Sequence, residues 1–174
     1  PRAIYRRLDP TIAQREGLSL GDALLRGEAA GEVIIEDRDG VSFLIDPCGG
    51  QKTGAYLDQR DNRHIVAQLS AHRSVLDVFC YAGSFGLVAL KKGARSALGI
   101  DSSQEALALA KKNAGHLGVS MDLMQGDAAA VMTELARAGR QFGVVVCDPP
   151  KFAQRAADVE GALRGYEYIN RLAM

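Results

Sequence analysis

The chain has 174 residues, with 21 basic and 21 acidic side chains, so its formal net charge is zero. This disfavours binding of nucleic acid mainly through bulk positive charge, although a local basic face could still bind it. Its three cysteines, Cys48, Cys80 and Cys147, form no CxxC pair, which excludes a disulfide scaffold and a structural zinc cluster. No apolar run reaches the ~18 residues of a membrane span, so we expect a cytoplasmic protein with no membrane contact.

The first part of the chain shows two different patterns. Residues 1–30 mix basic and acidic side chains, and we interpret them as an irregular, solvated linker. Two runs suited to β-structure follow at 32–37 and 41–46, and the Asp-Gly turn between them predicts a β-hairpin. After a glycine-rich stretch, residues 57–71 are expected to form a helix with Leu57, Ile65 and Leu69 near one face.

From residue 74 the pattern alternates between strand and helix. The expected strands are 74–80, 97–101, 119–124 and 142–147. The expected helices are 84–92, 102–118 (opened by a Ser102–Glu105 capping box), 128–138 and, more weakly patterned, 154–174. This alternation predicts right-handed βαβ units and a parallel sheet, in which ligands bind beyond the carboxyl ends of the strands.

An acidic residue stands at each of the four expected strand ends. Asp77 lies at the root of a G-x-x-G loop, which differs from the G-x-G-x-x-G of dinucleotide folds, and it could accept a hydrogen bond from a cationic amino group. Asp101 could accept from two ribose hydroxyls, and Asp127 from an adenine amino group; both also fit simple helix caps. Asp148 opens the fourth loop. Together the four acids point to a nucleoside ligand.

The fourth loop has the sequence Asp148-Pro149-Pro150-Lys151-Phe152. Two successive prolines cannot continue a strand ladder and lack backbone donors, so they predict a stiff, projecting loop with free carbonyls. A rigid acid-and-carbonyl platform beside an aromatic ring suits the gripping of a planar base.

These segments resemble class I S-adenosylmethionine-dependent methyltransferases, and within that class the bacterial large-subunit (23S) ribosomal RNA cytosine-5 methyltransferases. The likeness covers roughly residues 10–174, and its most specific piece is the GQKTGxYLDQRDNR stretch at 50–63. Further matches lie at 75–86, 99–103, 126–127, 144–152, 164–166 and 170–172, whereas Ala55 stands where the family usually has phenylalanine. The resemblance implies a Rossmann-like α/β sheet with its first four strands present, after a small β-hairpin region. The expected domains are 1–50 and 51–174.

The resemblance also implies S-adenosyl-L-methionine as cofactor and ribosomal RNA as partner. The positions that it places around the cofactor, from the methionine end through the amino acid and ribose to the adenine, are Gln51, Lys52, Thr53, Tyr56, Asp77, Phe79, Tyr81, Gly83, Asp101, Ser102, Asp127 and Ala128. Asp148 is expected to be catalytic and to face the methyl group, and Pro149, Pro150, Lys151 and Phe152 are expected to meet the target base. No metal is implied.

Methylation at cytosine C5 raises the question of the nucleophile. Family enzymes attack C6 with a cysteine thiolate, and the resemblance places that cysteine beyond Met174. Cys80 and Cys147 are interpreted as small buried hydrophobic residues instead. In the family's strand order the fourth strand would be left as an apolar edge, which invites pairing with another chain, such as a homodimer partner. We therefore expect a fragment of a larger enzyme.

Other functions stay open from the sequence. One is another RNA base methyltransferase, acting on guanine N7 or on an amino group; in amino methylation the aromatic residue usually follows the second proline directly, whereas Lys151 intervenes here. Another is a non-catalytic cofactor-binding or RNA-binding fragment. A dinucleotide-dependent oxidoreductase is disfavoured, because it requires the missing G-x-G-x-x-G loop.

Overall fold

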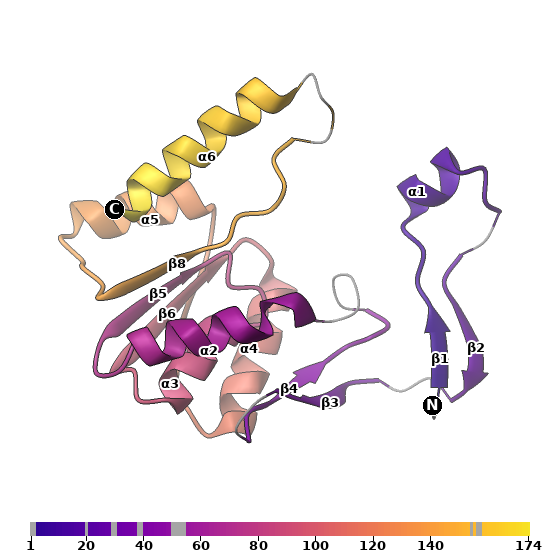
Figure 1. The fold of residues 1–174 in the computed structure, drawn as a ribbon, viewed down its shortest axis with the longest axis horizontal. Helices are drawn as coiled ribbons and strands as arrows, with labels where there is room; N and C mark the ends of the chain where they lie inside the picture. Colours follow the sequence, from indigo (N-terminus) through magenta and orange to yellow (C-terminus); the bar gives the residue numbers. More distant parts are fainter. Residues whose placement is uncertain are drawn as a thin grey trace. The chain divides into compact units, whose positions relative to one another are not determined.

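The computed structural model describes residues 3–19, 21–28, 31–37, 40–49, 55–153, 155 and 158–174. The chain forms two compact units, Pro1–Gln59 and Arg60–Met174, and each is considered by itself (Figure 1). Among the described residues no helix is both long and apolar enough to cross a membrane.

Residues 3–6, 10–15 and 23–27 form regular structure, so the expectation of an irregular linker was wrong for this part of the chain. Strand β1 (Ala3–Arg6) pairs antiparallel with β2 (Ala23–Gly27), and helix α1 (Pro10–Arg15) lies between them in the chain. At the start of helix α1 the Asp9 side chain accepts hydrogen bonds from the amides of Thr11 and Ile12. Pro10, the first helical residue, has a ring that fixes φ near the helical value. Strands of four and five residues, each with one arginine, are too short for their alternation to stand out in the sequence.

The predicted hairpin is confirmed. Strand β3 (Val33–Glu36) pairs antiparallel with β4 (Ser42–Ile45), and Gly40 in the turn has a φ of +74°. Phe43 and Ile45 are buried, and the residues between them along the strand are only half-buried. This is the alternation expected of a sheet with one covered face.

The second unit contains the predicted parallel sheet. Its strands are β5 (Ser74–Val78), β6 (Ser96–Asp101), β7 (Asp122–Gln125) and β8 (Val144–Cys147), in the spatial order β7-β6-β5-β8. All neighbouring pairs are parallel. The Rossmann-like α/β fold class predicted from the sequence is therefore confirmed, and β8 lies at one edge of the described sheet, as the resemblance implied.

Helices cover both faces of this sheet (Figure 1). They are α2 (Arg60–Leu69), which follows the short helix η1 (Leu57–Gln59), then α3 (Ser84–Lys91), α4 (Gln104–Leu117), α5 (Ala128–Arg137) and α6 (Val159–Ala173). The chain steps outward from β5 to β7 and then returns to β8. Right-handed crossovers therefore place α3 and α4 on one face and α5 on the other. The strand order reverses between β5 and β8, where ligands bind in such sheets.

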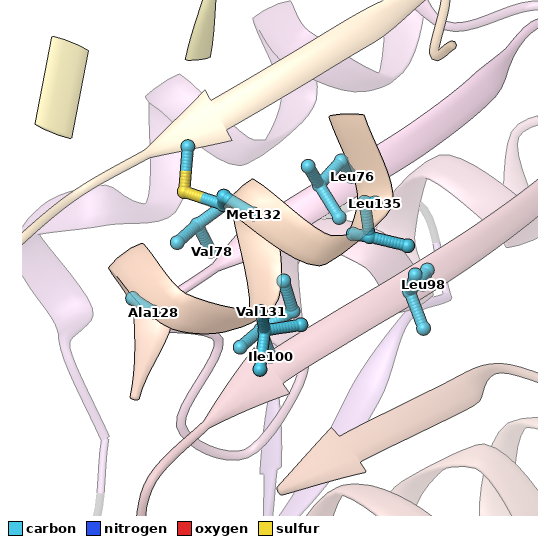
Figure 2. Packing of buried hydrophobic residues seen from close by; sticks show 8 residues of the cluster. All are labelled: Leu76, Val78, Leu98, Ile100, Ala128, Val131, Met132 and Leu135. Atoms are coloured by element: carbon cyan, nitrogen blue, oxygen red, sulfur yellow. The ribbon is translucent and has the colours of Figure 1, made fainter. Parts of the chain in front are cut away.

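The face under α5 is a continuous apolar core. Leu76, Val78, Leu98 and Ile100 project from β5 and β6 toward α5 (Figure 2). The α5 side chains that meet them are Ala128, Val131, Met132 and Leu135. Since Leu76 and Val78 point to this face, Asp77 between them points to the face that carries α3.

The α3 face is packed closely around Met121. A Cβ atom at Gly86 would lie 2.5 Å from Met121 Cε, and one at Gly99 would lie 2.7 Å from it. Met121 is thus buried under two glycines just before the β7 ladder begins at Asp122. The strand expected from residue 119 starts later, because α4 ends at Leu117 with Gly118 as its C-cap and the chain first inserts Met121 into this core.

Helix α2 packs against α3, but not through the face expected from the sequence. Leu57, Ile65 and Leu69 are 63%, 56% and 61% exposed. The buried side chains of α2 are Arg63, His64 and Ala67. Arg63 and His64 both have interaction partners in the structure. The packed face is thus partly polar, which an apolar periodicity cannot indicate.

Candidate functional site

Asp77 sits on β5 and stabilises the start of α3. Its side chain is 1% exposed, and its Oδ2 accepts a hydrogen bond from the Gly86 amide at 2.9 Å. The residue at the N-cap position, Gly83, has a φ of +75° and no side chain to cap the helix. Asp77 therefore satisfies one of the free amides of the first helical turn from the neighbouring strand.

Two neighbouring carboxylates act on Asp77 at this edge of the sheet. Burial raises the pKa of Asp77 to about 7, the hydrogen bond from Gly86 opposes that rise, and the charges of Asp148 and Asp101 add to it. These three residues come from β5, β6 and the end of β8, which are neighbours in the sheet. The structure thus brings together three of the acids predicted to form the site.

The β5–α3 loop has an unusual backbone. Phe79 and Tyr81 have φ values of +62° and +49°, a region that residues with a Cβ seldom adopt. The Cys80 amide donates to the Ile100 carbonyl at 2.9 Å, and the Tyr81 amide donates to Asp101 Oδ2 at 2.8 Å. The β5–α3 loop, which the resemblance places under the amino acid moiety of the cofactor, is therefore hydrogen-bonded to the end of β6 through the amides of both Cys80 and Tyr81.

Asp101 ends β6 and holds two loops by their backbones. Oδ2 accepts from Tyr81, and Oδ1 accepts from the Ser103 amide at 2.9 Å. An ionised carboxylate has about four acceptor positions, so two stay available for donors such as ribose hydroxyls. The residue that caps α4 is Ser103, whose Oγ accepts from the Ala106 amide, so the predicted cap at Ser102 was one residue early. Ser102 is exposed beside Asp101.

Asp127 follows β7 and caps α5. Its Oδ1 accepts from the Ala130 amide at 3.0 Å, which confirms the helix-cap interpretation that the sequence left open. The side chain is exposed, so the cap leaves acceptor positions facing solvent. The Gly126 amide donates to the Asp101 carbonyl at 3.0 Å and joins this loop to the end of β6. Ala128 is buried in the core under α5.

The loop after β8 projects as predicted. Asp148, Pro150 and Lys151 are exposed, whereas Pro149 and Phe152 are half-buried. Phe152 packs on the Tyr166 ring of α6, with the ring centroids 4.5 Å apart. The resemblance includes Tyr166 in the matched segment 164–166 but implies no role for it, and a contact across fourteen residues leaves no local pattern in the sequence.

The two cysteines at strand ends are poorly suited to act as nucleophiles. Burial, and then the charges of Asp77 and Asp101, raise the pKa of Cys80. Burial and the charge of Asp148 raise the pKa of Cys147. Both thiols are therefore held protonated, as expected for structural cysteines.

The remaining predicted site positions lie in the other part of the chain. Gln51, Lys52 and Thr53 are outside the described residues. Tyr56 is half-buried and belongs to the first compact unit. In the preceding loop, Asp46 accepts from the amides of Cys48 and Gly49 in a tight turn after β4.

The parallel strand order β7-β6-β5-β8, with helices on both faces, defines the class of the second unit: it has a Rossmann-like α/β fold. A SAM-dependent methyltransferase from Agrobacterium tumefaciens is 22% identical with a TM-score of 0.72, covering 87% of this chain and 48% of that one. A tRNA (uracil-54, C5)-methyltransferase from Pyrococcus abyssi is 23% identical with a TM-score of 0.59, covering 95% and 39%. At this identity the likeness concerns the fold.

The chain belongs to the family described as Conserved hypothetical protein 95, whose model matches residues 62–171. Ribosomal RNA large subunit methyltransferase I of Aeromonas hydrophila is 42% identical over 175 residues, covering 98% of this chain and 44% of that protein. The resemblance to bacterial large-subunit ribosomal RNA methyltransferases is thus confirmed. The chain spans less than half the length of the curated relatives that it matches.

Proposed function

We propose that the complete protein is an S-adenosylmethionine-dependent methyltransferase that acts on ribosomal RNA of the large subunit, at C5 of a cytosine. The observation that carries this proposal is the row of acids Asp127, Asp101, Asp77 and Asp148 along the strand order β7-β6-β5-β8. The printed name of the Aeromonas hydrophila relative supports the RNA substrate.

The donor and acceptor groups of this edge fit the proposed cofactor. Asp101 keeps acceptor positions for the two ribose hydroxyls, and exposed Asp127 suits the adenine amino group. Asp148 is an exposed acid where a cationic amino acid and sulfonium would lie, and Asp77, whose pKa is raised to about 7, adds partial negative charge there. When bound, S-adenosylmethionine supplies an electrophilic methyl group. From the resemblance we add Gln51, Lys52, Thr53 and Tyr56 on the methionine side.

The loop after β8 provides the substrate side of the proposed site. A carbonyl oxygen has two acceptor positions, so the Pro150 carbonyl, which accepts one hydrogen bond from Tyr166 Oη, can also accept one from a base. Exposed Lys151 suits a phosphate and Phe152 suits the face of the base. Because the pKa values of Cys80 and Cys147 are raised, we infer that a thiolate for attack at C6 comes from neither residue.

The test is methyl transfer from S-adenosylmethionine to large-subunit ribosomal RNA lacking the modification, using the complete protein and identifying the product nucleoside by mass spectrometry. The proposal predicts 5-methylcytidine. Methylated guanosine or an N-methylated base would support an S-adenosylmethionine-dependent RNA methyltransferase but would refute the assignment to cytosine C5. No transfer to any ribosomal RNA or ribosomal particle would refute the proposed function.

A further inference from the structure

The hydroxyl of Tyr166 on α6 contacts the backbone on both sides of Lys151. The Phe152 amide donates to Tyr166 Oη at 3.2 Å, and Tyr166 Oη donates to the Pro150 carbonyl at 3.3 Å. A phenol can donate one hydrogen bond and accept others at the same time. One side chain therefore ties two backbone groups that flank the exposed lysine.

The sequence of the loop explains why such a tie is needed. Pro149 and Pro150 have no backbone N–H, so the loop cannot be held by amide donors at these positions. The first described amide beyond the prolines with a side-chain acceptor is that of Phe152. Tyr166 thus compensates for the donors that the prolines remove, at the point where the chain leaves the sheet.

The rings and the neighbouring glycine add to this arrangement. The Phe152 and Tyr166 rings are 4.5 Å apart at an interplanar angle of 31°. A Cβ atom at Gly165 would lie 3.1 Å from Phe152 Cδ2, closer than ordinary contact. The absence of a side chain at Gly165 therefore leaves room for Phe152 to lie against α6.

We propose that Tyr166 is a positioning residue that fixes the 150–152 backbone in the shape that presents Lys151 and Phe152 to the RNA base. It acts through the loop, whose backbone the Tyr166 hydroxyl holds from α6. This inference rests on the proposed function, since that proposal assigns the loop to the base. It adds a residue of α6 to a site otherwise built from strand ends.

The test compares Tyr166→Phe with Tyr168→Phe in the complete protein. Tyr166→Phe keeps the ring and removes only the hydroxyl, whereas Tyr168 is on the same helix, 54% exposed, and serves as the matched control. We expect Tyr166→Phe to lower kcat for RNA methylation about tenfold or more, because misplaced groups react slowly. S-adenosylmethionine affinity and Tm should stay close to wild type, and Tyr168→Phe should change none of the three.

Hydrogen exchange at the Phe152 amide gives a readout independent of activity. Loss of the Tyr166 acceptor should make this amide exchange at least several-fold faster in Tyr166→Phe and leave it unchanged in Tyr168→Phe. An unchanged kcat in an active enzyme would overturn the inference, and so would losses of cofactor affinity or Tm that match the loss of kcat. If the wild-type protein methylates no RNA, the proposed function fails. The exchange rate then decides whether Tyr166 holds the loop: faster exchange supports it and unchanged exchange overturns it.

Discussion

Two aspartates of the site each serve the fold and the proposed ligand. Asp77 caps α3 from a buried position, and Asp101 holds two loops through the amides of Tyr81 and Ser103. Each carboxylate is fixed by backbone donors before any ligand arrives, which is the preorganisation that precise binding requires. The same contacts mean that a substitution at either position affects both stability and binding, so both must be measured.

The first prediction concerns Asp101→Ala. We expect the variant to bind S-adenosylmethionine more weakly by roughly 1–3 kcal/mol, because the ribose hydroxyls lose their acceptor. Isothermal titration calorimetry measures this, with Tm recorded alongside because two backbone amides also lose a partner. The matched control is Asp122→Ala, an exposed acid at the amino end of β7. An Asp101→Ala variant that binds S-adenosylmethionine as tightly as the wild type would show that Asp101 is not part of the cofactor site.

The second prediction concerns pH. Burial raises the pKa of Asp77 from 3.8 to about 7, so between these values the folded state holds a proton that the unfolded state has released. The free energy of unfolding should therefore fall by a few kcal/mol as the pH rises from about 4 to about 7. Asp77→Asn should lose this component, since the amide oxygen can still accept from Gly86. Urea unfolding across that range measures it, and equal pH slopes in both proteins would contradict the expectation.

At the scale of elements, the packing of helices on both faces of the sheet positions the strand ends that carry the site. The glycines on the α3 face let α3 and residue 121 approach β6 closely, and this packing sets the distance between the β5–α3 loop and Asp101. The core under α5 fixes the other side of the same strands (Figure 2). The acids are thus placed by two packed faces that share β5 and β6.

The third prediction tests this packing with Gly99→Ala. Its Cβ would lie 2.7 Å from Met121 Cε, 2.9 Å from Cys80 Sγ and 3.0 Å from Leu123 Cδ2, so at least one neighbour must move. We expect a loss of about 1–3 kcal/mol in the free energy of unfolding, as for other overpacked cores. Gly115→Ala on α4 is the control.

At Gly115 nothing lies within 4 Å of a Cβ. That substitution should stabilise by roughly 0.5–1 kcal/mol, since alanine favours a helix over glycine. Chemical denaturation of both variants checks the pair. Equal effects at Gly99 and Gly115 would show that the α3 face tolerates the extra methyl group.

The sequence predicts a helix or strand correctly where its residue pattern is local. The prediction fails where contacts with residues distant in the chain determine the structure. The apolar runs at β5, β6 and β8 and the glycines after α4 and α5 were read correctly. The β1–β2 pairing joins residues about twenty positions apart, and the burial of Met121 depends on glycines from two other elements. Likewise, the four acids could be predicted as site residues because each stands at the end of an expected strand. The left-handed backbone at Phe79 and the hydrogen bond between Tyr166 and Phe152 could not, because they depend on partners elsewhere in the chain.

At the scale of the whole molecule, the family, the fold and the acids agree on one class of protein. The matched relatives are more than twice as long as this chain, so the proposed RNA specificity and any attacking thiolate concern the complete protein. The zero net charge of these 174 residues does not oppose the proposed RNA substrate, because a local basic surface can contact RNA without a net positive charge.

The most direct test of the central claim is mass spectrometry of large-subunit ribosomal RNA from cells lacking the gene. The account predicts that one 5-methylcytidine disappears, that the wild-type gene and the Asp122→Ala control restore it, and that Asp101→Ala restores it poorly. An unchanged set of methylated nucleosides in the deletion strain would contradict the account.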